Sequence, residues 1–370
     1  MTTTVAPPAS QAAPPSTQDR RENTKRARAL LASSALAILI VGVFLATLAF
    51  GSVFVPVGDV LAVLLGEDRV ARAFSRIVLE LRLPRAVAAL AVGAALGAAG
   101  LQMQTLFRNP LASPSTLGIN SGASLGVALV VLPGGLAGAG LFGSVGFAGR
   151  AGSALAAALG AAATMLLLMV VARRVTNGLT LLIIGLMIGY AASAVVSVLI
   201  YVAESQSVQS YIVWTFGTFA TVTVDDLVLL GGAIALGLVL AWLTRNELNV
   251  LLLGDRYSRT MGVSVRRIRA LTIISASLLA GTVTAFCGPV AFIGVAAPHM
   301  ARGLFGTSDH RVLLPGTMLV GALIALVAGF VAHIPGSASI LPLNAVTALI
   351  GAPVVIAVLR SRRLARAMAQ

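Results

Sequence analysis

The sequence contains one cysteine, Cys287, and one lysine, Lys25, among 370 residues. A single cysteine excludes an intramolecular disulfide framework and any metal site built from several thiolates. A Walker A loop needs a lysine after a glycine-rich turn, so a lone lysine in the polar N-terminal segment excludes ATP binding of that kind by this chain. The three histidines are scattered, and no paired carboxylates lie in an apolar setting. We therefore predict no catalytic residues, no metal site and no cofactor, and a protein that is not an enzyme.

Charged residues are also scarce. They make up 10% of the chain, compared with about 25% in an ordinary soluble domain. Hydrophobic residues make up 58%, and the mean hydropathy is +0.97, which is typical of an integral membrane protein. A net charge of +14 would suggest nucleic acid as the partner of a soluble protein, but in a membrane protein a basic surplus marks the cytoplasmic loops. We therefore expect membrane lipid, and no nucleic acid, around this chain.

Apolar segments long enough to cross a bilayer, which takes about 20 residues, occur repeatedly along the sequence. One unbroken apolar stretch is too long for a single span, and we divide it at Cys287-Gly288-Pro289. The result is an all-α integral membrane protein with about ten transmembrane helices. The expected spans are Ala29–Phe50, Pro84–Leu106, Ser115–Val131, Gly152–Val171, Leu179–Tyr201, Val224–Leu243, two within Ala270–Phe305, Leu313–Ala332 and Asn344–Leu359.

The ends of the chain differ in composition from the spans. Residues 1–28 are rich in Pro, Ala, Ser and Thr, and we expect them to form a disordered N-terminal tail. The transmembrane domain then covers residues 29–363, followed by a short tail, 364–370. With the N-terminus inside, 20 of the 26 basic residues fall on the cytoplasmic side, in agreement with the positive-inside rule. Both termini are accordingly predicted to be cytoplasmic.

Three regions carry recognisable motifs. The first joins Leu-Arg-Leu-Pro-Arg at Leu81–Arg85 to Asn-Pro-Leu-Ala-Ser-Pro-Ser-Thr-Leu-Gly at Asn109–Gly118. The second is the segment Leu252–Arg269, and the third combines Gly288–Arg302 with Leu341–Val354. Together these segments resemble the permeases of bacterial ABC importers for iron–siderophore complexes, haem and cobalamin, the FecCD type. The resemblance covers nearly the whole predicted transmembrane domain.

This resemblance implies one subunit of a larger importer in the bacterial cytoplasmic membrane. A second permease subunit would complete a central path, in a homodimer or a heterodimer. Two separate ATP-binding cassette ATPases would bind on the cytoplasmic side, and an extracytoplasmic substrate-binding protein would deliver the cargo. We expect ferric siderophores as the cargo, with cobalamin or haem as the alternative. An ion-coupled secondary transporter is the alternative from another class, but such proteins usually keep ionisable groups at mid-membrane and no span here has one.

The stretch that follows the second span is predicted to be a tight cytoplasmic turn. Pro110 and Pro114 each remove a helix donor and disfavour helix at the preceding residue. Asn109 precedes the first proline, and Gly118 allows the next span to pack closely. A purely structural role is the simpler interpretation. The resemblance implies that this turn lies near the dimer interface and the translocation path.

The segment Leu252–Arg269 alternates charged and apolar residues on the predicted cytoplasmic side. One interpretation is a solvated loop that contributes only positive charge. The resemblance implies instead a pair of short coupling helices that sit in a groove of the ATPase. We favour coupling because a plain loop needs neither the Leu-Leu-Leu lead-in nor the Met-Gly-Val core. The residues that match the family pattern are Gly254, Asp255, Met261, Gly262 and Val263.

Five arginines between positions 69 and 85 crowd the predicted outer side, against the positive-inside trend. Only three carboxylates lie near these arginines in sequence. Local ion pairs can therefore neutralise at most three of the five positive charges. The resemblance places Arg82 and Arg85 where an acidic surface of the binding protein docks. His333 stands where the family usually has an arginine, and it completes the expected docking set. Ile340 and Asn344 replace the usual glutamate and glycine, so we expect partner binding there to differ.

The fifth span carries Gly185, Gly189, Ser193 and Ser197 at a four-residue spacing. We expect this weakly polar face to line the translocation path, because tight binding would trap a bulky cargo. The alternative is helix packing, since Gly-x-x-x-Gly pairs let membrane helices approach closely. Separately, similar runs follow Arg82 and Arg266 in spans of opposite orientation, which indicates a weak inverted internal repeat.

Overall fold

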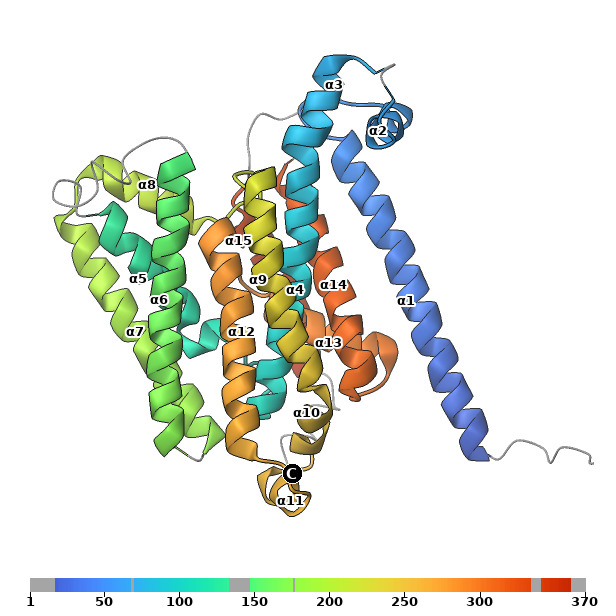
Figure 1. The fold of residues 1–370 in the computed structure, drawn as a ribbon, viewed down its shortest axis with the longest axis vertical. Helices are drawn as coiled ribbons and strands as arrows, with labels where there is room; N and C mark the ends of the chain where they lie inside the picture. Colours follow the sequence, from blue (N-terminus) through green and yellow to red (C-terminus); the bar gives the residue numbers. More distant parts are fainter. Residues whose placement is uncertain (1–16, 68–69, 133–146, 176, 334–340, 361–370) are drawn as a thin grey trace, which may run out of the picture.

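The structure is a computed structural model that describes residues 17–67, 70–132, 147–175, 177–333 and 341–360. Every regular element in these residues is helical, and the long helices form a bundle (Figure 1). Seven of the described helical segments are long and apolar enough to cross a bilayer, which agrees with the predicted membrane class. The helices concerned are α1 (Thr17–Ala49), α4 (Leu83–Phe107), α6 (Phe147–Arg174), α7 (Gly178–Val202), α9 (Val224–Leu243), α12 (Val265–Cys287) and α14 (His310–Ala332).

Three further apolar helices are shorter: α5 (Ile119–Val131), α13 (Ile293–Phe305) and α15 (Leu343–Arg360). With the seven longer helices they correspond one to one to the ten predicted spans. At 1.5 Å per residue, the 13 residues of α5 or α13 cover about 20 Å, less than the roughly 30 Å of a hydrocarbon core. The long apolar stretch divides where predicted, because α12 ends at Cys287 and Gly288 adopts a positive φ of 72°.

The remaining helices lie at the two ends of the bundle. In Figure 1, α10 and α11 are at one end, here called the α11 end, and α2, α3 and α8 are at the other, here called the α8 end. These helices are α2 (Val57–Leu64), α3 (Arg72–Arg76), a π-helical segment η1 (Ile77–Arg82) that leads into α4, a 3-10 turn η2 (Pro114–Leu117), α8 (Ser205–Thr215), α10 (Arg245–Leu251) and α11 (Asp255–Thr260).

Helices α4 and α12 form the centre of the bundle, and their segments are the most buried of the candidate spans. They run in opposite directions, as the predicted inverted repeat requires, because the end of α4 and the start of α12 both contact Asp255 at the α11 end. Close packing depends on small residues. A Cβ atom on Gly93 of α4 would overlap the carbonyl oxygen of Gly321 in α14, so glycine at both positions lets the two helices pack closely.

Helix α1 lies at the edge of the bundle and is little buried. It begins at Thr17, so residues 17–28 are helical where the sequence predicts disorder, whereas residues 1–16 and 364–370 lie outside the described part. Arg28 fastens the helix to α13: its Nε and Nη2 atoms donate to the carbonyl oxygens of Leu304 and Gly303, each over 2.9 Å. These carbonyls belong to the last turn of α13, where a cation is favourable.

Candidate functional site

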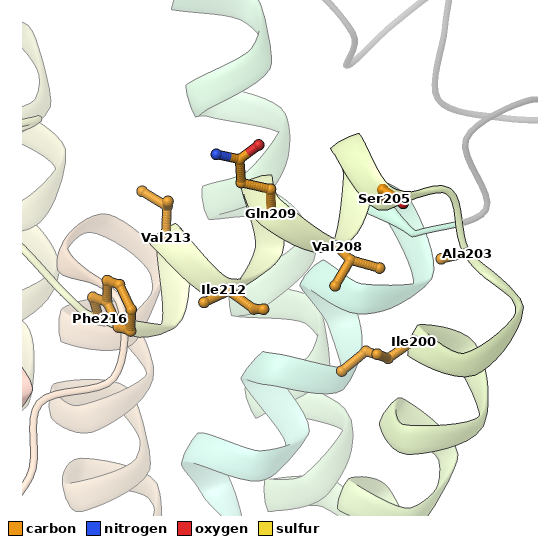
Figure 2. Close-up of a pocket in the computed structure, with 8 residues that line it drawn as sticks. All are labelled: Ile200, Ala203, Ser205, Val208, Gln209, Ile212, Val213 and Phe216. Atoms are coloured by element: carbon orange, nitrogen blue, oxygen red, sulfur yellow. The ribbon is translucent and has the colours of Figure 1, made fainter.

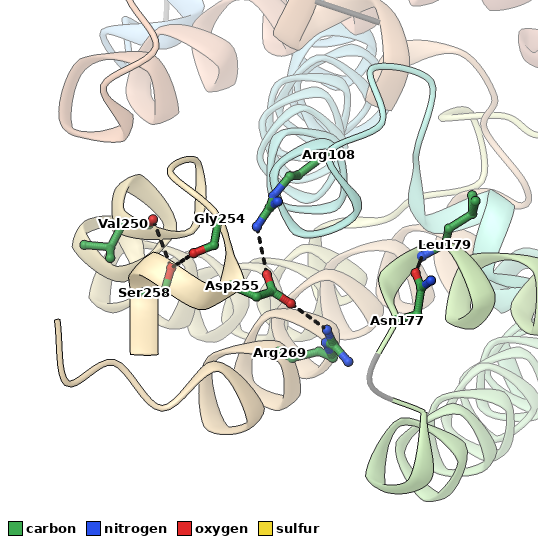
Figure 3. Close-up of polar contacts among 8 residues, drawn as sticks. All are labelled: Arg108, Asn177, Leu179, Val250, Gly254, Asp255, Ser258 and Arg269. Carbon is green, nitrogen blue, oxygen red and sulfur yellow. Dashed lines mark hydrogen bonds and ion pairs between the residues drawn. The ribbon is translucent and has the colours of Figure 1, made fainter. Parts of the chain in front are cut away.

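The α11 end carries a compact unit built from α10, α11 and the start of α12. Gly254 precedes α11 with a φ of +111°, which only glycine adopts readily. The buried hydroxyl of Ser258 contacts the carbonyl oxygens of Gly254 (2.7 Å) and Val250 (3.1 Å), which ties α11 back to α10 (Figure 3). The sharp turn between the two helices is therefore fixed from inside.

This unit has a small apolar core of its own. The buried side chains of Leu248 and Leu251 from α10 pack with those of Val265 and Ile268 from α12. Val263, one of the predicted coupling residues, packs against this cluster, as does Leu106 from α4. The core is separate from the main bundle core among the described residues, so α10 and α11 form a folded lobe and not a solvated loop.

Asp255 fixes this lobe to the bundle. Its carboxylate accepts a hydrogen bond from Arg108, at the end of α4, over 2.8 Å, and lies 3.6 Å from a guanidinium nitrogen of Arg269 in α12 (Figure 3). Arg108 reaches it because it caps α4 in the left-handed conformation, with a φ of +47°. Asp255 and Arg108 are both half-exposed, so water screens the pair and it adds about 1 kcal/mol or less to stability. The main effect of the pair is to fix the position of the lobe relative to α4.

The lobe exposes three large apolar side chains beside exposed basic ones. Leu253, Tyr257 and Met261 have relative exposures of 63%, 53% and 55%. Gly262 follows with a φ of +78°, and a Cβ atom placed on it would meet nothing within 4 Å. The geometry thus explains glycine at 262 by its backbone and leaves open space around it. A rigid lobe that presents large apolar side chains to the outside is typical of a protein-binding surface.

The predicted turn after α4 is tight and well bonded. Asn109 accepts a hydrogen bond from the backbone N–H of Leu111 over 2.9 Å, and the carbonyl oxygen of Pro110 lies 2.8 Å from Nε2 of His299 in α13. Pro114 begins η2, and Gly118 ends it with a φ of +76°. Asn109 and Pro110 thus bond at the end of α4, whereas Pro114 lies near Gly294 and Gly118 packs against Gly185 and Gly189 of α7, inside the bundle.

Helix α7 does not present its predicted lining as one face. Gly185 and Gly189 are buried against Leu117 and Gly118, where a Cβ atom on Gly118 would lie 2.8 Å from the carbonyl oxygen of Gly185. Ser193 and Ser197 are exposed instead. The two glycines are therefore packing residues, and only the two serines remain candidates for the path.

The α8 end also corrects a prediction. Arg82 is only 8% exposed, and its guanidinium donates to the carbonyl oxygens of Leu48 (2.7 Å), Ala49 (2.9 Å) and Val53. It closes the end of α1 and is not the exposed docking charge that the sequence predicts, because a charge pattern does not reveal carbonyl acceptors 29 to 34 residues earlier in the chain.

Arg85 and His333 do lie near one another at this end. Nδ1 of His333 lies 3.0 Å from the carbonyl oxygen of Gly329. Desolvation lowers the pKa of His333, the hydrogen bond to Gly329 opposes this shift, and the charge of Arg85 lowers the pKa further. The imidazole is thus neutral at neutral pH and does not replace the positive charge of an arginine.

A groove of about 580 Å³ lies beside α8, where α7 ends (Figure 2). Its lining is largely apolar, with a hydroxyl and an amide as polar groups and no charged side chain among its residues. Such a surface can contact a bulky molecule without holding it tightly. The lining residues are Ile200, Ala203, Ser205, Val208, Gln209, Ile212, Val213 and Phe216.

With this geometry in place, comparison with known proteins assigns the family. The sequence profile described as the FecCD transport family matches residues 38–361. The chain belongs to this family. Membership agrees with the family resemblance of the motifs and makes the chain a multi-pass membrane permease of the ABC importer type, a transport subunit and not an enzyme.

Two vitamin B12 import permeases are similar in sequence to most of this chain. The vitamin B12 import system permease protein BtuC of Klebsiella pneumoniae is 38% identical over 286 residues, 76% of this chain and 82% of that protein. The protein of the same name from Salmonella typhi is 36% identical over 341 residues, 91% and 96% of the two chains.

Solved structures resemble the permease as well. One, an ABC transporter described as of the metal-chelate type in an inward-facing conformation, is 29% identical with a TM-score of 0.75, and covers 87% of this chain and 96% of that one. PsaBC from Streptococcus pneumoniae, solved with a Fab, is 19% identical with a TM-score of 0.51 over 74% and 89% of the two chains, and shares the fold.

Several polar contacts at the α11 end of the permease belong to no sequence motif. Thr105 and Gln104 of α4 contact His310 and Arg302, and His310 in turn contacts Asn249 of α10. Each partner comes from a segment distant in sequence, and the residues follow no spacing that a pattern could reveal. A histidine at the start of an apolar span was the one available signal, because polar groups in a membrane are costly and need partners.

Proposed function

We propose that this chain is the permease subunit of an ATP-driven importer in the bacterial cytoplasmic membrane, with the α11 end in the cytoplasm. The lobe formed by α10 and α11 carries this proposal. It has its own core, is fixed to α4 and α12 through Asp255, and exposes Leu253, Tyr257 and Met261. A separate ATPase is the partner that such a surface would bind, because the chain has no Walker A lysine of its own.

The distribution of charge supports this orientation. Several arginines are exposed at the α11 end, and basic side chains collect on the cytoplasmic side of membrane proteins. The α8 end then faces the outside, where Arg85 would help to receive an extracytoplasmic binding protein. The exposed arginines at the α11 end are Arg173, Arg174, Arg259, Arg266, Arg267 and Arg311.

The cargo in this proposal is a large metal chelate. Cobalamin is the first candidate, because the relatives at 36–38% identity are named for vitamin B12 import. A ferric siderophore is the second candidate, supported by the resemblance to the transporter of the metal-chelate type and by the motifs at Asn109–Gly118 and Gly288–Arg302. The uncharged groove beside α8, together with a second permease copy, would provide a path with weak affinity.

Transport by proteoliposomes tests this function. The permease is reconstituted with its partner ATPase and binding protein, and uptake of cobalt-labelled cobalamin and iron-labelled siderophores is followed. We expect uptake that requires ATP and survives collapse of the proton and sodium gradients. Uptake driven by an ion gradient without the ATPase would favour the secondary-transporter alternative and reject the importer. The cargo arm is separate, since ATP-dependent uptake of a siderophore alone would change the cargo and keep the mechanism.

A further inference from the structure

Three polar residues at the end of α4 contact three other helices. Gln104 accepts a hydrogen bond from Arg302 of α13 over 2.6 Å, and Oγ1 of Thr105 lies 2.8 Å from Nε2 of His310, the first residue of α14. Three residues further, Arg108 holds Asp255 of α11. One turn of the central helix therefore meets the coupling lobe and two neighbouring helices.

The contact between Thr105 and His310 continues into the lobe formed by α10 and α11. Nδ1 of His310 lies 2.7 Å from Oδ1 of Asn249 in α10, and the same oxygen accepts from the backbone N–H of His310 over 2.8 Å. Both ring nitrogens of His310 are thus engaged, one toward α4 and one toward α10. A continuous chain of hydrogen bonds joins Asn249, His310 and Thr105.

Burial and a further contact make this chain rigid. Thr105 and His310 are 2% and 1% exposed, so water does not compete for their contacts. The amide of Asn249 is oriented by Asp309, whose Oδ1 accepts from its Nδ2 over 2.6 Å. Partial desolvation would raise the pKa of Asp309, but the hydrogen bonds from Arg311 and Asn249 lower it overall, so the carboxylate stays charged.

The second link between the lobe and α4 is weaker. The ion pair of Arg108 and Asp255 is half-exposed and screened by solvent, whereas the contact between Thr105 and His310 is buried and the contact between His310 and Asn249 is partly buried. Helix α14 is also locked to α4 by backbone contact, where Gly321 faces Gly93. A displacement of α10 would therefore move α14 and α4 together.

We infer that Asn249, His310 and Thr105 form a relay that transmits movement of the coupling lobe to the central helices α4 and α14. The inference rests on the proposed function and deepens it: these are positioning residues that act through the lobe on which the ATPase pushes. None of the three is among the exposed apolar residues of the lobe or among the residues that line the groove beside α8. Loss of the relay should therefore lower the cargo transported per ATP hydrolysed more than it lowers ATP hydrolysis itself.

The test is a Thr105→Val substitution in the complete permease–ATPase–binding-protein complex. Valine keeps the shape and removes the hydroxyl, which breaks the relay at α4. Thr317→Val is the matched control, because Thr317 is 0% exposed and its hydroxyl donates to the carbonyl of Leu313 within α14. We expect Thr105→Val to lower the cargo transported per ATP hydrolysed about 5-fold or more, with Thr317→Val and Thr105→Ser close to wild type.

Asn249→Ala breaks the relay at its other end and covers the case in which Thr105→Val does not assemble. In a series relay the double variant should lose no more coupling than the more severe single variant. Wild-type transport per ATP in both single variants, or multiplied losses in the double variant, would overturn the relay. A wild-type complex that shows no ATP-dependent uptake would instead reject the proposed function, so the two failures are distinguishable.

Discussion

Arg82 donates a hydrogen bond of 2.7 Å to the carbonyl oxygen of Leu48, 34 residues earlier in the chain. The same nitrogen reaches the carbonyl of Ala49 at 2.9 Å. The last carbonyls of a helix lack partners within it, and they carry the negative end of the helix dipole. A buried guanidinium therefore completes the end of α1 and holds this peripheral helix against α4.

Removal of this side chain should destabilise the protein. Arg82→Ala leaves buried carbonyls without donors, and hydrogen bonds to a charged group contribute about 1.5–3 kcal/mol each. We expect the free energy of unfolding in detergent to fall by about 2–4 kcal/mol. Arg76→Ala is the control, because Arg76 is exposed and its pair with Glu80 spans 3.6 Å. Equal thermal shifts in the two variants would show that Arg82 does not hold α1.

Gly262 separates a backbone effect from a contact effect. Its positive φ disfavours most side chains, but asparagine tolerates this conformation. Gly262→Asn should therefore fold, while its added bulk should reduce co-purification of the ATPase about 10-fold. Gly66→Asn is the control, since Gly66 has a similar φ of +76° and open space around it at the opposite end of the bundle. If both variants retained the ATPase fully, the proposed docking surface would not extend to Gly262.

Asp255 should affect both coupling and stability. Asp255→Asn loses the charge that faces both Arg108 and Arg269, whereas Arg108→Gln loses one of these two contacts. We expect a change in unfolding free energy of about 1 kcal/mol or less for Arg108→Gln, whose pair is half-exposed, and a larger loss for Asp255→Asn, because the guanidinium of Arg269 is buried. Transport per ATP should fall about 3-fold in Asp255→Asn and less in Arg108→Gln. The reverse order would show that the lobe is not positioned through Asp255.

The ten apolar segments could be predicted because span length and apolar composition are local properties of the sequence. The faces of those helices could not. A four-residue spacing advances about 40° per step on an α-helix, so the line from Gly185 to Ser197 turns by about 120°. The buried face follows the mixed spacing of Leu181, Gly185, Gly189, Ala192 and Val196 instead. The four-residue motif from Gly185 to Ser197 therefore crosses from a buried face of α7 to an exposed one.

Polar contacts across the bundle could not be predicted either, because their partners are far apart in the sequence. Thr105 and His310 are 205 residues apart, and neither lies in a pattern that names the other. The residues predicted to couple to the ATPase lie in one short segment, from Gly254 to Val263, so a local motif could point to them. Local sequence thus located the lobe, and only the packing of α4 against α14 and α10 revealed how it is attached.

Arg85 remains the strongest docking candidate after Arg82 is assigned to α1. It is half-buried at the α8 end beside His333, whose lowered pKa keeps the imidazole neutral at pH 7. We expect Arg85→Glu to slow capture of the loaded binding protein about 10-fold at low salt, and less at high salt, because charges at a docking surface mainly accelerate association and are screened by ions. His333→Gln should have little effect at pH 7, and Arg259→Glu at the α11 end should have none. Measured association rates that are equal for Arg85→Glu and wild type at low salt would remove Arg85 from the docking surface.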